Sequence, residues 1–413
     1  MCSLAYVKLR HRALCSDSYS NDVVRVSGRV LSIRNDRFLT IEDWTSHKLQ
    51  LNVCVGFTRR KSVLMAGQVR TGDSVDAEGV LYKDKLGNVS LLVDSLMLVA
   101  RFSRDSKHTE LMIASENAKH LLQRTAVVAE LRRLLIGRGY VEVETPVLQT
   151  LDLTNTNVKP FVTCYEWRKK PMQLRISPEF WLKNFISLEA RLGIFEFAKS
   201  FRNEGSSAFH LMEFSLLETY CLDLDFESGL RWVIEVINHL TSLFLGYSVS
   251  YRLMSFCEVI RETTGYRVEL MDFSKALRIF KPLNTLSTTD SLPHLLNSVF
   301  DNAVKHIRGL CYVLWFPTGD SKFSESKWRD SKFALRFETY WDGLELVNAS
   351  IELSDLTVQL KRCRSGINPT LSECLTRGLR PTFGMGLGVD RLCLRLFNFR
   401  NVLSASCCPN FKF

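Results

Sequence analysis

Charged and aromatic side chains alternate in the segments FRNEG (201–205) and HLMEFSLLETY (210–220). Every second side chain of a strand faces the same way, so Arg202 and Glu204 would share a face. A strand returning from the tip would present four more side chains on one face, namely Phe214, Leu216, Glu218 and Tyr220. Such a surface is a poor core and a good polar pocket. The alternative is an exposed, ion-paired hairpin, because surface strands often carry alternating charges.

Glycines and an arginine distinguish a second segment, GMGLGVDRLCLRLF at 384–397. Three alternate glycines lead into a predicted helix that carries Asp390 and Arg391 in its first turn. Glycine lets the backbone approach a ligand closely, and a helix start with an arginine favours phosphate oxygens. The dinucleotide fingerprint GxGxxG is not met, because Val389 occupies the last glycine position, and GxxxxGK[ST] does not occur.

A third segment, RFETYWDGLELVNASIELSD at 336–355, places four polar residues close together: Glu338, Glu345, Asn348 and Glu352. Carboxylates this close repel one another unless they share a cation, and Mg²⁺ on a nucleotide is the usual cation at a phosphate site. Strand alternation puts Glu345 on the face opposite the other three, so a β-bulge or the turn at 342–343 must bring it in. An acidic face in solvent is the alternative. The three segments together describe an ATP site on an antiparallel sheet.

The elements that must hold these residues fall into two groups. Residues 23–99 contain five short alternating segments separated by turns, which predicts a five-stranded barrel of the oligonucleotide-binding type, with another small all-β module as the alternative. Beyond about residue 111 the apolar period lengthens and predicts helices over 121–137 and 226–243, with a strand between them that ends at Pro146. The larger part is therefore predicted to be α+β around an antiparallel sheet.

Composition limits the classes of protein. A chain of 413 residues has room for two domains, and 46% hydrophobic with 24% charged residues is typical of a soluble globular protein. Charged residues interrupt every apolar run before the ~18–20 residues that cross a bilayer, so no membrane span is predicted. The net charge of +10 favours a polyanionic partner, with a solvated basic surface as the alternative.

Cysteine usage and the first residues bear on location. The twelve cysteines include no CxxC pair, which indicates a reducing, cytoplasmic location rather than a disulfide framework or a zinc site. Lys8, Arg10 and Arg12 precede the first acid, Asp17, so an organelle-targeting segment is the alternative.

Three segments, in this order, resemble the motifs of the class II aminoacyl-tRNA synthetases. GYVEVETPVL (139–148) resembles motif 1, FRNEG with HLMEF resembles motif 2, and GMGLGVDRL (384–392) resembles motif 3. LRISPEFWLK (174–183), GLELVNASIELSD (343–355) and GLRPTFGMGLGVDR (378–391) are similar to the lysine-specific members, as is the length of the motif 2 tip. The ε-ammonium of lysine needs carboxylates and a hydroxyl, which Glu218 and Tyr220 can supply.

The resemblance implies an α+β class II catalytic domain built on an antiparallel sheet over 103–413. It also implies an N-terminal five-stranded OB-fold barrel that binds the anticodon over 23–102, and an extension over 1–22. The implied reaction makes lysyl-adenylate from lysine and ATP, with Mg²⁺, and transfers lysine to the 3′ end of tRNA. A homodimer built on motif 1 is implied as well.

The resemblance also implies roles for single residues. Arg202 and Arg391 would be catalytic, and positioning and charge stabilisation would replace a nucleophilic side chain. The residues implied to bind ATP are Arg202, Glu204, His210, Phe214, Glu338 and Arg391. Those implied to bind lysine are Glu179, Arg202, Glu218, Tyr220, Asn348 and Glu352. Mg²⁺ would be held by Glu338 and Glu345. Phe38 and Gln50 would read anticodon bases, with barrel core as the alternative for Phe38.

Several positions depart from the family pattern. Thr154 and Asn155 stand in place of a glycine pair, Ser350 in place of an aromatic residue, and Leu211 in place of an asparagine. The family's SPLAK-like segment is not recognisable in SKFSESKWRDSKF (321–333), whose KFSES resembles a class I loop without the HIGH-type partner. These departures bear on amino-acid selectivity and catalytic efficiency.

The alternatives to a lysine-specific synthetase are an asparaginyl or aspartyl synthetase, an enzyme that lysylates a protein such as elongation factor P, and a non-catalytic RNA-binding relative.

Overall fold

The computed structural model describes residues 18–43, 47–102, 115–152, 158–188, 193–268, 273–280, 292–328, 331–363 and 366–405. Thr154 and Asn155 lie outside the described residues. The described residues up to Gln123 belong to one compact unit, and those from Arg124 onward belong to a second. Within the described part of the chain, every helix is too short or too polar to cross a membrane.

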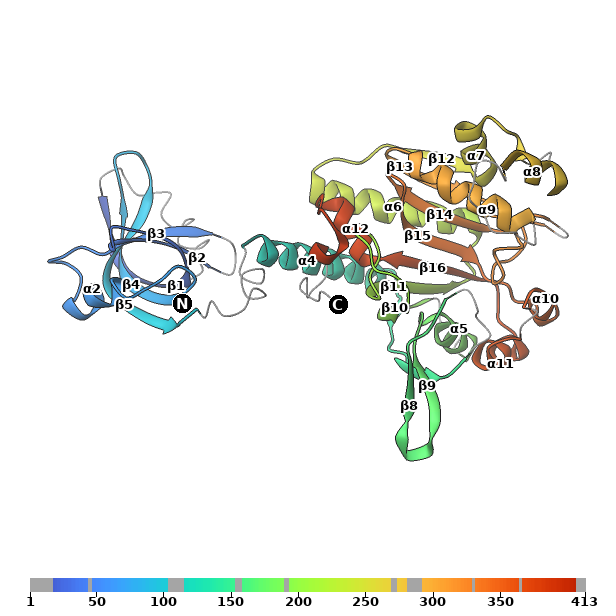
Figure 1. The fold of residues 1–413 in the computed structure, drawn as a ribbon, viewed down its shortest axis with the longest axis horizontal. Coiled ribbons are helices and arrows are strands. Elements are labelled where there is room, and N and C mark those ends of the chain that lie inside the picture. Colours follow the sequence, from blue (N-terminus) through green and yellow to red (C-terminus); the bar gives the residue numbers. More distant parts are fainter. Residues whose placement is uncertain are drawn as a thin grey trace. The chain divides into compact units, whose positions relative to one another are not determined.

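The first unit is a five-stranded barrel (Figure 1). Its strands are β1 (Ser18–Arg34), β2 (Phe38–Glu42), β3 (Lys48–Asn52), β4 (Ser74–Lys83) and β5 (Val89–Ala100). They pair in the order β1-β2-β3-β5-β4, and β4 pairs back to β1. Helix α2 (Arg60–Ala66) connects β3 to β4 and packs on β5. This is the predicted barrel, and its alternating apolar residues, such as Leu39, Ile41 and Leu51, fill the interior.

An eight-stranded sheet forms the centre of the second unit. In order across the sheet, its strands are β12 (Tyr251–Ser255), β13 (Leu310–Leu314), β14 (Arg336–Trp341), β15 (Leu344–Ile351), β16 (Thr382–Gly388), β11 (Glu213–Leu222), β10 (Gly193–Phe201) and β6 (Val141–Glu142). The two outermost pairs are parallel and the pairs between them are antiparallel. The predicted α+β class with an antiparallel sheet is confirmed.

Three helices cover one face of this sheet and leave the other face for a site. They are α4 (Ser115–Gly137), α6 (Phe226–Leu245) and α12 (Val389–Leu396), and they share a core with the sheet residues Leu217, Val347 and Leu387. Their strand neighbours Glu218, Asn348 and Gly386 point to the opposite face, because successive side chains of a strand alternate. The predicted helices 121–137 and 226–243 lie inside α4 and α6.

Further helices build two smaller cores beside the sheet. The helices α7 (Phe256–Thr264), α8 (Phe273–Phe280) and α9 (Leu292–Ala303) pack against β13, with the 3₁₀ turn η4 (Val304–His306) following α9. The helices α5 (Glu179–Leu188) and α11 (Pro369–Arg377) pack together near the end of β11, and α10 (Leu356–Arg362) precedes α11. A last 3₁₀ turn, η5 (Val402–Ala405), follows α12.

The predicted strand ending at Pro146 is reduced to the short strand β6, which ends at Glu142. The next strand, β7 (Leu148–Thr150), begins after the proline and joins a three-stranded sheet with β8 (Val162–Tyr165) and β9 (Lys170–Leu174). The 3₁₀ turn η1 (Glu166–Arg168) forms the tip of the β8–β9 hairpin. Side-chain bonds replace the strand ladder at the break, because Arg175 Nη1 donates to Thr145 O at 3.1 Å and Thr145 Oγ1 donates to Glu196 at 2.7 Å.

Candidate active site

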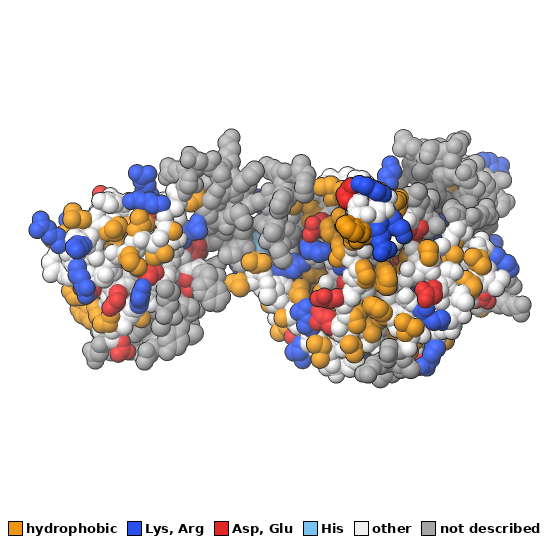
Figure 2. Space-filling model, turned by 90° about the horizontal axis from the view of Figure 1, so that it is seen from below, with side chains coloured by type: hydrophobic (Ala, Val, Ile, Leu, Met, Phe, Trp, Pro, Cys, Tyr) orange, Lys and Arg blue, Asp and Glu red, His pale blue; other side chains and the backbone are white. Residues whose placement is uncertain are grey.

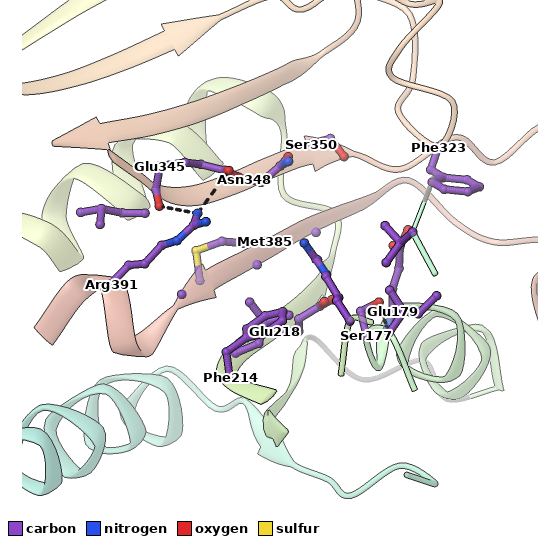
Figure 3. Close-up of a pocket in the computed structure, with 18 of the residues that line it drawn as sticks. Ser177, Glu179, Phe214, Glu218, Phe323, Glu345, Asn348, Ser350, Met385 and Arg391 are labelled. Atoms are coloured by element: carbon purple, nitrogen blue, oxygen red, sulfur yellow. Dashed lines mark hydrogen bonds and ion pairs between the residues drawn. The ribbon is translucent and has the colours of Figure 1, made fainter. Parts of the chain in front are cut away.

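A cavity of about 400 Å³ opens on the uncovered face of the sheet in the second unit. Figure 3 shows Arg391 and Glu345 at one end, Phe214 and Glu218 near the middle, and Glu179 with Phe323 at the other end. The predicted site residues that line the cavity are Glu179, Arg202, Glu204, His210, Phe214, Glu218, Tyr220, Glu345, Asn348, Glu352 and Arg391. Both predicted catalytic arginines therefore face one space, although 189 positions separate them.

Glycines on β16 make room for this cavity. Gly386 pairs with Glu218 on one side and Asn348 on the other, and Gly384 pairs likewise with Tyr220 and Ser350. The middle member of each cross-strand row thus has no side chain, which leaves room for the cavity over Gly386 and for the Glu352 carboxylate and the Tyr220 ring over Gly384. A Cβ atom at Gly384 would collide with the Glu352 carboxylate and lie 2.7 Å from the Tyr220 ring. Glycine is required here for close approach rather than for an unusual backbone angle.

Arg391 and Glu345 form the end of the cavity that suits phosphate. Arg391 follows the last glycine, in the first turn of α12, and its Nη1 lies 3.0 Å from Glu345 O and 3.4 Å from Glu345 Oε2. His210 lines the same end, where burial and the nearby charge of Arg391 lower its pKa. Ser207 Oγ lies 2.9 Å from His210 Nδ1 and orients the ring. A helix start, an arginine and a neutral imidazole are suitable donors for phosphate oxygens.

Arg202 stands where β10 ends and the hairpin tip begins. Its backbone nitrogen donates to Met212 O at 2.8 Å, which closes the base of the tip, and its guanidinium carbon lies 5.0 Å above the centre of the Phe214 ring. The Nε atom of Arg202 is buried and has no hydrogen-bond partner among the described residues. A buried, unsatisfied cationic donor facing a cavity is a ready binding group for an anion.

Carboxylates gather at the opposite end of the cavity. Glu218 is 6% exposed, and it accepts a hydrogen bond of 2.9 Å from the hydroxyl of Tyr220. Burial raises the pKa of Glu218 to about 8, and the neighbouring charge of Glu179 adds to the effect. Burial likewise raises the pKa of Glu352 to about 7. A buried carboxyl with a raised pKa binds a cation in its ionised form, so an added cation must displace the proton that burial favours.

The comparisons with known proteins agree with this geometry. The family model described as tRNA synthetases class II (D, K and N) matches residues 101–412. The chain belongs to this family. Two relatives are the lysine–tRNA ligases of Sinorhizobium medicae strain WSM419, 27% identical over 94% of this chain and 87% of the relative, and of Pseudomonas aeruginosa strain LESB58, 28% identical over 94% and 86%. The lysine–tRNA ligase of Thermoanaerobacter pseudethanolicus is 26% identical over 96% of this chain and 88% of the relative.

A β-bulge turns Glu345 toward the synthetase site, as the alternation of side chains along the strand predicted. The register between β14 and β15 shifts between Thr339 and Tyr340, so that Thr339 faces Val347 while Tyr340 faces Glu345. Leu346 is the extra residue, and the shift turns Glu345 to the same face as Glu338 and Asn348.

Glu338 does not line the cavity with the other predicted residues of this synthetase. Its carboxylate is buried behind the wall, where it accepts hydrogen bonds from Arg336, from the Tyr340 hydroxyl and from Asn348 Nδ2 at 3.2 Å. Burial raises its pKa to about 7. The two glutamates predicted to hold Mg²⁺ therefore differ in position. Glu345 reaches the cavity and is paired there with Arg391, whereas Glu338 does not.

The donor set fits Mg²⁺ only together with a nucleotide. The described residues contain no group of three or more His, Cys, Asp or Glu side chains that could hold a metal. Mg²⁺ commonly takes one or two carboxylates and fills its shell with phosphate oxygens and water. Glu345 is placed for that role, whereas Glu338 would first have to release Arg336.

The structure adds residues at the site that the sequence did not single out. Lys183 of α5 lies outside the cavity lining but reaches two of the lining carboxylates, and its spacing of four from Glu179 was the available signal. Arg336 lines the wall and donates to Asn348 Oδ1 at 3.1 Å and Ser321 Oγ at 3.2 Å. Residues 320–324 line the cavity too, although their Ser- and Lys-rich sequence carries no recognisable family pattern.

The two remaining predicted residues lie on the barrel of the first unit. Phe38 is 36% exposed while Leu39 beside it is fully buried, so the Phe38 side chain is not part of the barrel core. Gln50 on β3 donates to Asn52 Oδ1 at 2.8 Å and accepts from Arg34 Nη2 at 3.3 Å. Arg34 and Asn52 each pair with Phe38 across the strands, so an aromatic ring, amides and a guanidinium share one outward face.

Proposed function

We propose that this chain is a lysine–tRNA ligase that activates lysine with ATP and transfers it to the 3′ end of tRNA(Lys). The observation that carries the proposal is the buried Glu218–Tyr220 pair in the cavity that also contains Arg202 and Arg391. One end of the cavity is built for a cation and the other for phosphate. The names of the three relatives and the family match support the same assignment.

In the activation step, the lysine carboxylate attacks the α-phosphorus of ATP, the bond to the β-phosphate oxygen breaks, and diphosphate leaves. Arg202 would hold the carboxylate and the α-phosphate, because its Nε is buried and unsatisfied. Arg391 would bind the γ-phosphate after exchanging Glu345 for it. Phe214 would lie under the adenine, and Glu204 and His210 would contact the nucleotide. No side chain acts as nucleophile, so positioning and charge stabilisation supply the catalysis.

Lysine would lie along the carboxylate end of the cavity. Glu179 would bind the α-ammonium, and the ε-ammonium would reach Glu218 and the hydroxyl of Tyr220. Asn348 and Glu352 would complete the pocket. At the opposite, phosphate end, Mg²⁺ bound with the triphosphate would neutralise phosphate charge. Glu345 is the residue placed to hold it, and Glu338 lies behind the cavity wall.

The barrel would bind the anticodon. Phe38 offers an exposed ring on which a base can stack, and Gln50 offers an amide for base edges. We accordingly assign 23–102 to the anticodon-binding domain, 103–413 to the catalytic domain, and 1–22 to an extension.

A homodimer is part of the proposal. In the second unit, several large apolar side chains near motif 1 are at least 40% exposed, namely Ile136, Val141, Val147, Leu148 and Val162. Figure 2, which views the molecule from the side of the β8–β9 hairpin, shows hydrophobic side chains at the surface of the second unit, interspersed with charged ones. A second copy would cover such a surface.

A cytoplasmic location is also part of the proposal. The buried cysteines Cys221, Cys311 and Cys374 are thiols, which suits a reducing cytoplasm.

The alternatives fit the cavity less well. An aspartyl or asparaginyl synthetase would have to bind an anionic or neutral side chain against Glu218 and Glu352, both buried carboxylates. An enzyme that lysylates a protein would leave the barrel without a role. A non-catalytic relative would not need Arg202 and Arg391 facing one cavity.

ATP–diphosphate exchange measured separately with each of the twenty amino acids tests the proposal. Exchange with lysine, followed by charging of a tRNA(Lys) transcript, is the expected result. Exchange with aspartate or asparagine would assign the chain to another branch of the family. Absence of exchange with every amino acid would support the non-catalytic alternative.

A further inference from the structure

Lys183 places a buried ammonium group against two of the carboxylates at this end of the cavity. Its Nζ lies 2.7 Å from Glu179 Oε1 and 2.5 Å from Glu352 Oε2, so one lysine side chain bridges two of the residues proposed to bind the substrate. The same atom lies 5.3 Å from the centre of the Phe323 ring and 6.0 Å from that of Tyr220. The side chain comes from α5, whereas Glu352 directly follows β15, so the bridge ties a helix to the sheet.

This bridge differs from an ordinary ion pair on a helix surface. The Lys183 side chain is 2% exposed and that of Glu352 is 5% exposed, whereas most i,i+4 pairs lie in water and contribute little. A buried ammonium without partners would be costly, and the two carboxylates that contact Lys183 offset that cost. Burial alone would lower the pKa of Lys183, but the charges of Glu179 and Glu352 raise it, and the group stays protonated.

Among the described residues, the titratable groups around Lys183 come from four segments of the second unit. Glu179 is on α5, Glu352 follows β15, Glu218 and Tyr220 are on β11, and Cys374 of α11 donates its thiol to Lys183 O at 3.2 Å. The three carboxylates carry up to three negative charges and Lys183 carries one positive charge. The remaining difference of two equals the two ammonium groups of a free lysine.

We propose that Lys183 is a positioning residue that sets the charge of the pocket to match lysine, by pairing with the carboxylates of Glu179 and Glu352 and holding them in place before the substrate binds. The inference rests on the proposed function. With Glu352 already neutralised by Lys183, Glu218 becomes the carboxylate available to the ε-ammonium, and Glu179 can share its second oxygen with the α-ammonium. Without Lys183, three carboxylates would crowd together and take up protons, which lysine would then have to displace.

The test compares Lys183→Met, which keeps the apolar stem, with Lys183→Arg, which keeps the charge. Lys305→Met is the matched control, because Lys305 is an exposed lysine of the same unit outside the cavity lining. Steady-state ATP–diphosphate exchange gives kcat and KM for lysine from pH 6 to 9. Lys183→Met is expected to raise KM for lysine by about a hundredfold, with a smaller change in kcat. It should also move the rise of kcat/KM to higher pH, because the pocket carboxylates lose the cation that favours their ionised form.

Lys183→Arg is expected to recover most of the KM and the original pH profile. A KM and pH profile for Lys183→Met that match those of Lys305→Met would overturn the inference. An arginine variant as impaired as the methionine variant would also overturn the inference, because it would show that the shape of the side chain matters and its charge does not.

A second measurement does not depend on catalysis. Thermal unfolding of the free protein from pH 5 to 9 should show Lys183→Met losing more stability at pH 9 than at pH 5, and Lys183→Met/Glu352→Gln should regain part of the loss. If Lys183→Met does not fold, the unfolding measurement is made on the double variant instead. A double variant that folds no better than the single one would contradict the proposal that the charge of Lys183 offsets that of Glu352. If the wild type exchanges with no amino acid, the proposed function is wrong, while the unfolding arm still decides what Lys183 does.

Discussion

Replacing Glu218 by glutamine is the change that most directly examines the cation end of the cavity. Glutamine keeps the size of the side chain and can still accept the hydrogen bond of Tyr220, which is 2.9 Å long in the structure. It removes the negative charge that the ε-ammonium of lysine is expected to meet. The effect should therefore appear in the binding of lysine rather than in the binding of ATP.

The expected loss follows from the burial of the site. Glu218 is 6% exposed, so the lost contact is a buried one, and removing one partner of a buried charge pair costs about 3–5 kcal/mol. A loss of about 3 kcal/mol corresponds to roughly a hundredfold lower kcat/KM for lysine. The KM for ATP should change by less than about threefold, because Arg202, Phe214 and Arg391 are untouched.

The stability of the free protein should increase at high pH when Glu218 is replaced by glutamine, although the binding of lysine is weakened. The pKa of Glu218 is raised by burial from its ordinary value of 4.5 to about 8. For a group with a raised pKa in the folded state, the contribution to stability is full below pH 4.5 and is lost as pH rises through 8. That loss is on the order of 5 kcal/mol, and glutamine, which does not titrate, avoids it. Glu218→Gln should thus be more stable than the wild type at pH 9 and about equally stable at pH 5.

Two measurements check this reasoning. ATP–diphosphate exchange with varied lysine gives kcat/KM, and thermal unfolding at pH 5, 7 and 9 without ligand gives the stability difference. Glu235→Gln is the matched control, because Glu235 is an exposed glutamate of α6 that pairs with Arg138 and lies outside the cavity lining. A Glu218→Gln variant that keeps kcat/KM for lysine within about threefold, with a stability difference that does not vary with pH, would refute the assignment of Glu218.

Further predictions concern other parts of the site and the barrel. In the wild type, kcat/KM for lysine should rise about tenfold per pH unit below pH 8 and level off above it, because Glu218 must lose its proton to bind the ε-ammonium; a pH series of exchange rates measures this. Arg391→Ala should lower kcat/KM for ATP by about 3 kcal/mol, roughly a hundredfold, because a charge-stabilising donor is lost; exchange with varied ATP measures this. Gly384→Ala should lower stability by about 1–3 kcal/mol and raise KM for lysine, because its Cβ would collide with Glu352 and the Tyr220 ring; unfolding and exchange measure this, with Gly137→Ala, where a Cβ meets open space, as control. Phe38→Ala should lower the kcat/KM for tRNA charging by about tenfold or more and leave exchange unchanged, because only tRNA reaches the barrel.

Each of these predictions has a contrary result. A pH-independent kcat/KM would mean that Glu218 is ionised throughout. An Arg391→Ala variant with normal ATP kinetics would remove the phosphate role of that end of the cavity. A Gly384→Ala variant as stable as Gly137→Ala would show that β11, β15 and β16 can move apart. Equal effects of Phe38→Ala on charging and exchange would indicate a folding defect rather than a lost contact with tRNA.

Local periodicity was enough to predict several parts of the site. The hairpin of β10 and β11 places Phe214, Glu218 and Tyr220 at the cavity, because alternation along a strand depends only on backbone geometry. The glycine segment ends as predicted in a helix with Arg391 in its first turn. The need for a bulge beside Glu345 also followed from parity, and the register shift is present.

Other features depend on packing between distant segments. Glu338 shares its face with Asn348, yet Arg336 and Tyr340 bond its carboxylate behind the cavity wall, and alternation could not distinguish a wall from a lining. Residues 320–324 line the cavity because of where the chain runs between β13 and β14, a path with no periodic signal. The predicted strand before Pro146 is interrupted, because Arg175 and Glu196 bond Thr145 from neighbouring strands and loops.

The sequence by itself determined the alternation of the hairpin, the glycine floor with its helix, the barrel and the family. All of these arise from neighbours along the chain or from spaced motifs. Only the tertiary structure decided that Lys183 is buried between Glu179 and Glu352 and that Glu338 lies outside the cavity. The physical reason is that burial and charge pairing depend on which helix and which strand meet, and those partners are as far apart in the chain as residues 183 and 352.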